Sequence, residues 1–113
     1  MLDLDHIGIT VKDLDESIAF YQTIGYQLIN VFCEEGYNWA TLELNNHSLE
    51  LFQRTTNSKK NFDHIAYSYD DETDLIEKLG YKDKDLEVFY GSLNRKSFFI
   101  EDNNGKAIQF IKK

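Results

Sequence analysis

The chain repeats itself, and this repeat constrains its fold more than any other feature. Residues 4–7 read Leu-Asp-His-Ile, and residues 62–65 read Phe-Asp-His-Ile. Each copy continues as a short strand-like run and then as a helical segment that ends in Gly-Tyr, at residues 25–26 and again at residues 80–81. Such self-similarity is typical of a fold assembled from copies of one supersecondary unit. The 113 residues are therefore predicted to form one domain built from two similar modules.

The predicted elements follow the same order in both modules, which is strand, helix and then three strands. Asp13 can cap the first helix because Glu16 stands three residues later, and Gly25 can end it. Asp71 and Gly80 have these roles in a shorter second helix. The later strands are predicted at residues 27–34, 38–44 and 48–53, and at 86–90, 97–101 and 107–111. The sequence thus predicts an α+β fold with a first module (1–54), a linker (55–61) and a second module (62–113).

Alternation along the strands separates the side chains into two faces. We expect the two amphipathic helices to cover the bulky apolar face, which comprises Ile7, Ile9, Val11, Leu49, Leu51, Ile65, Tyr67, Ile108 and Phe110. Four polar side chains then share the uncovered face, namely His6, Glu50, His64 and Gln109. If the sheet curls, that face becomes a pocket.

The spacing of these four polar residues is nearly the same in both modules. Glu50 follows His6 by 44 residues (50 − 6), and Gln109 follows His64 by 45 (109 − 64). Neutral imidazole and carboxylate ligands suit Zn²⁺, Ni²⁺, Fe²⁺, Mn²⁺ or Co²⁺. A lone strand histidine is more often a hydrogen-bonded structural residue, and Gln109 also fits a hydrogen-bonding role in the pocket wall. The paired contexts favour one divalent ion at this site.

Composition excludes several classes of protein. The formal net charge of −8 repels a phosphate backbone, so we expect no nucleic-acid partner. No run of about 18 apolar residues occurs, so no membrane span is expected. Cys33 is the single cysteine, which rules out an internal disulfide, and we expect it to be a partly buried strand residue. The N-terminus lacks the pattern of a signal peptide, which favours a cytoplasmic protein.

Four segments together resemble the glyoxalase/bleomycin-resistance/dioxygenase family, also called the vicinal oxygen chelate superfamily. They are residues 5–15 (DHIGITVKDLD), 49–52 (LELF), 62–65 (FDHI) and 98–110 (FFIEDNNGKAIQF). The resemblance implies two β-α-β-β-β modules whose curled mixed sheets form a cleft, often in a homodimer with shared sites. Metal-dependent members have ligands at the positions of His6, Glu50, His64 and Gln109. The last position is usually glutamate in the lyases and epimerases of the family, so Gln109 is a departure.

The resemblance also implies a reaction. In the metal-dependent members, two vicinal oxygens of a substrate chelate the ion and a carboxylate moves a proton at the adjacent carbon. We therefore expect a glyoxalase I-like lyase or an isomerase (epimerase) acting on a small oxygenated substrate. Glu50 is the candidate catalytic base, and Gln109 would be a neutral ligand. The alternatives are a metal-free module that binds small molecules or drugs and, less favoured, a non-haem iron dioxygenase.

The alternation of side chains along the strands also indicates which residues could contact the substrate. Trp39, Phe52 and Phe99 are candidates for the pocket wall, and Ser48 shares the face of Glu50. Aromatic residues in a small α+β protein are more often part of the core, so this alternative stays open. Whether the site lies within one chain or across a dimer is also left open.

Overall fold

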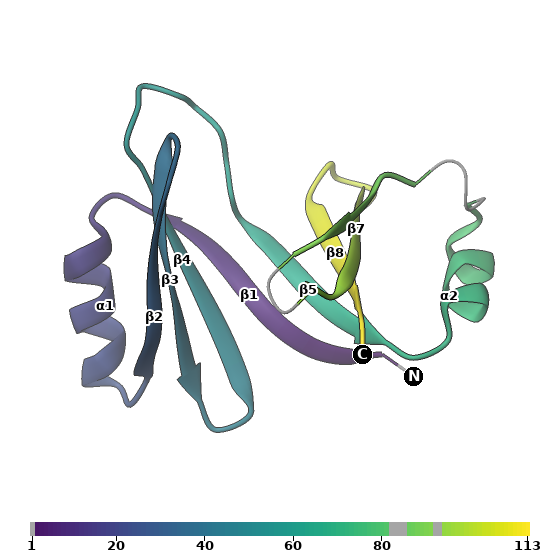
Figure 1. The fold of residues 1–113 in the computed structure, drawn as a ribbon, viewed down its shortest axis with the longest axis horizontal. Helices are drawn as coiled ribbons and strands as arrows, with labels where there is room; N and C mark the ends of the chain where they lie inside the picture. Colours follow the sequence, from purple (N-terminus) through teal and green to yellow (C-terminus); the bar gives the residue numbers. More distant parts are fainter. Residues whose placement is uncertain (1, 82–85, 92–93) are drawn as a thin grey trace. The chain divides into compact units, whose positions relative to one another are not determined.

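The predicted order of elements occurs twice along the chain. The computed structural model describes residues 2–81, 86–91 and 94–113. Its elements are β1 (Asp3–Val11), α1 (Leu14–Thr23), β2 (Gln27–Glu34), β3 (Tyr37–Leu44), β4 (His47–Arg54), β5 (His64–Tyr69), α2 (Glu72–Leu79), β6 (Val88–Tyr90), β7 (Lys96–Glu101) and β8 (Ala107–Lys112). The α+β class and the two β-α-β-β-β runs are therefore confirmed (Figure 1).

The chain divides into two compact units. The first unit is His6–His64, and the second unit combines Met1–Asp5 with Ile65–Lys113. Strand β1 begins in the second unit and continues into the first. The module boundaries predicted from the repeat, 1–54 and 62–113, concern the order along the chain and stay a prediction.

In the first unit, α1 packs on one face of a mixed sheet with the strand order β2-β3-β4-β1. Neighbours among β2, β3 and β4 are antiparallel, whereas β1 and β4 are parallel. The Asp13 side chain accepts a hydrogen bond of 2.9 Å from the Glu16 amide and so caps α1 as predicted. The core between helix and sheet consists of Leu14, Ile18, Ala40, Leu42, Leu49 and Leu51, with Ile9, Val11, Tyr21 and Tyr26 around it.

The second unit repeats this arrangement with the strand order β6-β7-β8-β5. Strands β5 and β8 are parallel, and β7 is antiparallel to both β6 and β8. Asp71 accepts a hydrogen bond of 3.0 Å from the Asp74 amide, and Gly80 ends α2 in the left-handed conformation with φ of 76°. Its core contains Tyr69, Leu75, Phe98 and Phe110. Both predicted helix caps are thus present.

Two expectations about burial were wrong. Ile7 and Ile65 have the parity of the helix-covered faces, yet they expose 39% and 38% of their surface. The helices have only 10 and 8 residues, so each covers only part of its sheet. Cys33 is exposed as well, because β2 is the edge strand of the first unit.

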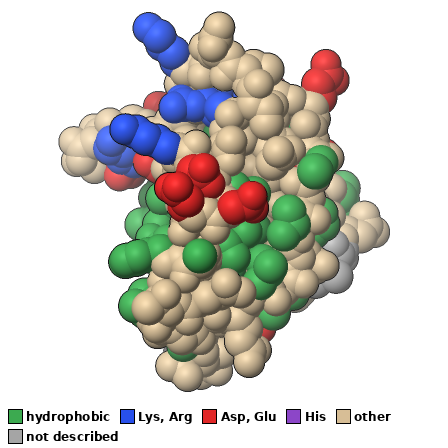
Figure 2. All heavy atoms as spheres, turned by 90° about the vertical axis from the view of Figure 1, so that its left-hand side faces the viewer, with side chains coloured by type: hydrophobic (Ala, Val, Ile, Leu, Met, Phe, Trp, Pro, Cys, Tyr) green, Lys and Arg blue, Asp and Glu red, His purple; other side chains and the backbone are tan. Residues whose placement is uncertain are grey.

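Hydrophobic side chains are exposed on the side of the first unit that carries α1 and β2 (Figure 2). The large exposed apolar residues here are Phe20 on α1, Ile24 directly after it, and Leu28, Ile29 and Val31 on β2. Among the described residues, no helix has the length and apolar character needed to cross a membrane.

Candidate metal site

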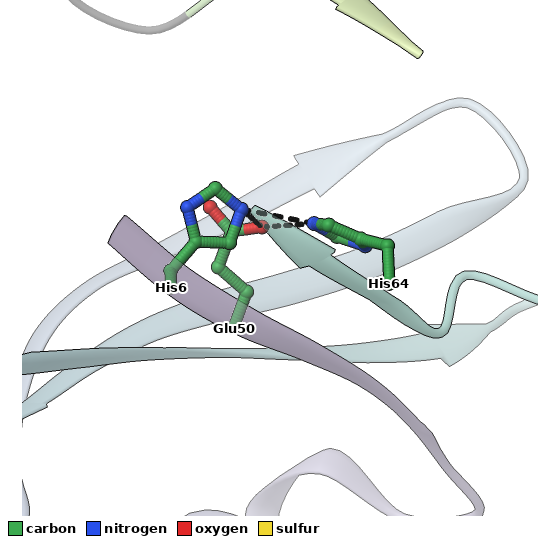
Figure 3. A group of neighbouring side chains, drawn as sticks. All are labelled: His6, Glu50 and His64. Carbon is green, nitrogen blue, oxygen red and sulfur yellow. Dashed lines mark hydrogen bonds and ion pairs between the residues drawn. The ribbon is translucent and has the colours of Figure 1, made fainter. Parts of the chain in front are cut away.

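Three predicted ligands meet within the first unit. His6 lies on β1, Glu50 lies on β4, and His64 is the first residue of β5. The parallel register of β1 and β4 aligns Gly8 with Glu50. Because Leu49 and Leu51 face α1, Glu50 must point to the other face of the sheet. The three side chains point toward one another there (Figure 3).

The potential ligand atoms form a small triangle. Nε2 of His6 lies 2.9 Å from Nε2 of His64 and 3.1 Å from Oε1 of Glu50, and Nε2 of His64 lies 3.3 Å from the same oxygen. The side chains are largely shielded, with 6% of His6, 8% of His64 and 17% of Glu50 exposed. Three atoms with lone pairs this close repel one another unless a proton or a cation lies among them.

The size of the triangle fits a shared metal ion. Two ligands about 2.1 Å from an ion lie about 3.0 Å apart at a right angle and about 3.4 Å apart at a tetrahedral angle. The three measured separations of 2.9 to 3.3 Å are within or close to this interval. Two imidazoles and one carboxylate are also a common ligand set for first-row transition metals. These residues therefore fit a divalent ion.

A backbone carbonyl orients the His64 ring. Nδ1 of His64 lies 2.7 Å from the carbonyl oxygen of Phe62. Because a carbonyl only accepts, Nδ1 must carry the hydrogen, and in neutral His64 this leaves the lone pair on Nε2. Metal-binding histidines in proteins are commonly fixed in this way by a second hydrogen bond. Nε2 therefore faces Glu50 and His6 in the form that a metal requires.

The Glu50 carboxylate is stabilised in its charged form. Burial alone would raise the pKa of Glu50, but the hydrogen bonds and positive charge that His6 and His64 offer in their protonated forms outweigh the burial. The pKa of Glu50 is therefore held below its ordinary value. At neutral pH this side chain is ionised, so its oxygens are available to a cation or a proton.

Hydrogen bonds attach the segment before His64 to β1. The Thr10 amide donates to Oδ1 of Asp63 at 2.6 Å, and the Phe62 amide donates to Oγ1 of Thr10 at 2.8 Å. The Asn61 side chain accepts from the Asp63 amide at 2.9 Å. The carbonyl that orients His64 thus belongs to a residue that is itself bonded to β1.

Trp39 and Phe52, two of the predicted pocket residues, belong to a row of stacked rings. Their ring centroids lie 5.4 Å apart, and Phe32 and Phe62 extend the row at 4.4 Å from Trp39 and 5.1 Å from Phe52. The centroid of Phe52 lies 5.9 Å from that of His64. The row therefore forms an apolar border beside His64. Ser48 lies on β4 on the same face as Glu50 and pairs in register with His6.

Gln109 and Phe99 belong to the second unit. They are register partners on β8 and β7, and Nε2 of Gln109 donates to Oγ of Ser97 at 3.4 Å. Gln109 is buried with 8% exposed, whereas Phe99 is 45% exposed and stacks on Phe89. The predicted roles of Gln109 as a ligand and of Phe99 in the pocket wall stay predictions.

The sequence reasoning missed the residues that hold the ligands in place. Thr10 and Asp63 act through hydrogen bonds between segments that are more than 50 residues apart, which no local pattern reveals. A weak signal existed for Gly8, because the residue two positions after the repeated histidine is small in both copies, Gly8 and Ala66.

The comparison with protein families agrees with this fold. Residues 3–110 match the Glyoxalase/Bleomycin resistance protein/Dioxygenase superfamily, also called the vicinal oxygen chelate superfamily. The chain therefore belongs to this superfamily. Its members commonly bind a metal ion and small-molecule substrates. No curated protein sequence gives a significant match.

Solved structures with the same fold perform different chemistry. A hypothetical protein from Bacillus halodurans matches with a TM-score of 0.75 and 20% identity, over 99% of this chain and 94% of that one. The methylmalonyl-CoA epimerase of Mycobacterium tuberculosis matches with a TM-score of 0.70 and 21% identity, over 96% and 86%. A trihydroxybiphenyl dioxygenase from Sphingomonas wittichii has a TM-score of 0.70 and 16% identity, over 97% and 42%. These similarities show the fold, and the reaction must be argued from the site.

Proposed function

We propose that this chain is a metal-dependent lyase or isomerase (epimerase) of the glyoxalase I type. It would act by proton transfer on a small oxygenated substrate that binds through two oxygens. The observation that carries this proposal is the convergence of Nε2 of His6, Nε2 of His64 and Oε1 of Glu50 within 3.3 Å. The ion is Zn²⁺, Ni²⁺, Fe²⁺, Mn²⁺ or Co²⁺, because the ligand set suits each of them.

The residues divide the work between holding the ion and moving a proton. When bound, the ion would stabilise negative charge that develops on a substrate oxygen. His6 and His64 are neutral ligands, and Gln109 is proposed as a fourth, also neutral. Glu50 is the proposed base that takes the proton from the carbon next to that oxygen, because it is the carboxylate of the cluster and is ionised at neutral pH. Trp39, Ser48, Phe52 and Phe99 are proposed to contact the substrate.

Metal binding is the direct test. Protein stripped with a chelator and titrated with Co²⁺ or Zn²⁺ should bind one ion per site, and His6→Ala should abolish the binding. His47→Ala is the matched control, because His47 is the third histidine of the chain, is exposed, and is absent from the ligand cluster. Trp39, the single tryptophan, stacks on Phe52 beside His64, so bound Co²⁺ should quench its fluorescence.

Two results would contradict the metal site. One is wild-type protein that binds no divalent ion at neutral pH. The other is equal loss of binding in His6→Ala and His47→Ala, which would mean that the ion sits elsewhere.

Two further functions are favoured by particular observations. The row of aromatic rings beside the ligands favours a metal-free module that binds apolar small molecules. This alternative predicts thermal stabilisation by such molecules in the chelator-treated protein. Two histidines with one carboxylate are also the ligand set of non-haem iron oxygenases. Oxygen consumption that requires Fe²⁺ and a vicinal diol would favour that reaction.

The assembly of the protein and its compartment also stay proposals. The family resemblance implies a homodimer, and the exposed apolar residues of α1 and β2 offer a surface that a second copy could bury. The cytoplasmic location stays a prediction from the sequence.

A further inference from the structure

We propose that Gly8 is a positioning residue for the metal site, because the absence of a side chain there allows His64 to lie where its Nε2 meets Glu50 and His6. This inference rests on the proposed metal site, but the contact between Gly8 and His64 is testable without any metal. The two residues are 56 positions apart (64 − 8) and both belong to the first unit.

The His64 ring occupies the space that a side chain on Gly8 would need. A Cβ atom built on Gly8 would lie 2.2 Å from Cε1 of His64, 2.4 Å from Nδ1 and 3.0 Å from Nε2. Ordinary van der Waals contact begins at about 3.5 Å. Any residue other than glycine at position 8 would therefore displace the imidazole ring.

The ring has little freedom to move away. On one side its Nδ1 is bonded to the Phe62 carbonyl at 2.7 Å, and on the other its Nε2 lies 3.3 Å from Oε1 of Glu50. A displacement large enough to admit a methyl group would lengthen at least one of these contacts. Loss of the first contact frees the tautomer of His64, and loss of the second removes Nε2 from the ligand triangle.

Backbone conformation does not explain the glycine. Gly8 lies inside β1 and is not among the glycines with positive φ, which are Gly25, Gly36, Gly80 and Gly105. The repeated position in the second copy is Ala66, so a strand of this kind accepts alanine two residues after the histidine. The requirement at position 8 is therefore one of packing against His64.

Two alanine variants separate this effect from a general cost of replacing glycine. Gly8→Ala should lower the affinity for Co²⁺ at least tenfold, the lower end of the effect of losing a residue that orients a ligand, and should change the visible absorption of the bound Co²⁺. Gly91→Ala is the control, because among the described residues its Cβ would meet nothing closer than 3.7 Å and its φ is not positive. It should bind Co²⁺ as the wild type does.

A double variant tests the contact itself. Gly8→Ala should lower the thermal unfolding midpoint in the wild-type chain but have much less effect in a His64→Ala chain, where no ring occupies the space. If Gly8→Ala alone does not fold, recovery of folding in the double variant gives the same information.

The outcomes distinguish the two proposals. Wild-type Co²⁺ affinity and spectrum in Gly8→Ala, or equal destabilisation with and without His64, would overturn the role of Gly8. Strong coupling between positions 8 and 64 in a protein that binds no metal would uphold the contact and overturn the proposed function instead.

Discussion

At the scale of single residues, the site brings Nε2 of His6 close to two acceptor atoms, Nε2 of His64 and Oε1 of Glu50, with which a proton or a cation can be shared. Nε2 of His64 is an acceptor because Nδ1 donates to a carbonyl, and Oε1 of Glu50 is an acceptor because the carboxyl is ionised. A metal ion that binds to His6, Glu50 and His64 must displace any proton that these side chains hold. Metal affinity should therefore fall as the pH is lowered, and loading should release protons.

Glu50→Gln tests the proposed role of this side chain as the base. The amide has nearly the same shape, so the fold should persist, but it carries no charge and cannot accept a proton from carbon. We expect exchange of a substrate's carbon-bound hydrogen with heavy water, followed by NMR, to fall by at least 100-fold. Glu43→Gln on β3, where the side chain is exposed, should leave the exchange unchanged. Unchanged exchange in Glu50→Gln would eliminate Glu50 as the base.

At the scale of elements, the site depends on how β1 meets the segment that enters β5. The Phe62 amide donates to the Thr10 hydroxyl, and the Phe62 carbonyl accepts from His64. Phe62 thus connects the middle of β1 to His64, a proposed metal ligand, within the first unit. A change in β1 that never touches the ligands should still affect them.

Thr10→Val tests this connection. Valine has the shape of threonine but removes the hydroxyl acceptor, which leaves the Phe62 amide without its partner. We expect a loss of about 1 kcal/mol in the free energy of unfolding and a weaker affinity for Co²⁺, measured by denaturant titration and calorimetry. Thr23→Val in the last turn of α1 is the control and should change neither value by much. Stability loss with unchanged affinity would show that the Phe62 carbonyl keeps its place without Thr10.

Local patterns predicted most of the elements and three of the side chains that meet in the cluster. Asp13 and Asp71 were recognised because a cap and its amide partner are only three residues apart. His6, Glu50 and His64 were recognised because strand parity and the repeat both place them on one face. Two other contacts depend on register and packing between distant segments, namely the hydrogen bond from Thr10 to Asp63 and the packing of His64 against Gly8. No local pattern in the sequence predicts these contacts. The exposure of Ile7 depends on how far a short helix reaches over its sheet.

At the scale of the whole molecule, stability in acid depends on carboxylates, which are numerous in a chain with a net charge of −8. In the second unit, Lys96 lies 2.6 Å from Glu72, which also accepts a hydrogen bond from Tyr69. The Lys96 ammonium, against the opposing effect of burial, lowers the pKa of Glu72. A carboxyl whose pKa is lower in the folded than in the unfolded state stabilises the fold fully when the pH is above the unfolded-state pKa. This contribution is lost as the pH falls through the folded-state pKa.

Lys96→Met should therefore destabilise the chain at pH 7 and have a smaller effect once the pH falls below the lowered pKa of Glu72, where this carboxyl is protonated in either protein. Urea unfolding followed by circular dichroism across this range measures the difference. Lys78→Met is the control, because its pair with Asp74 is largely exposed and should contribute little at any pH. A difference between Lys96→Met and the wild type that does not change with pH would contradict the role of Glu72.

The three ligands are widely separated along the chain, and this separation has a consequence for unfolding. An ion held by His6, Glu50 and His64 would cross-link the polypeptide and close loops of 44 (50 − 6) and 14 (64 − 50) residues. Such closure restricts the unfolded ensemble and so reduces the entropy gained on unfolding, as a disulfide does. The single cysteine of the chain allows no internal disulfide, so the bound ion would be the cross-link that stabilises the fold. In cells short of metal, the protein would therefore unfold more often and have a shorter lifetime.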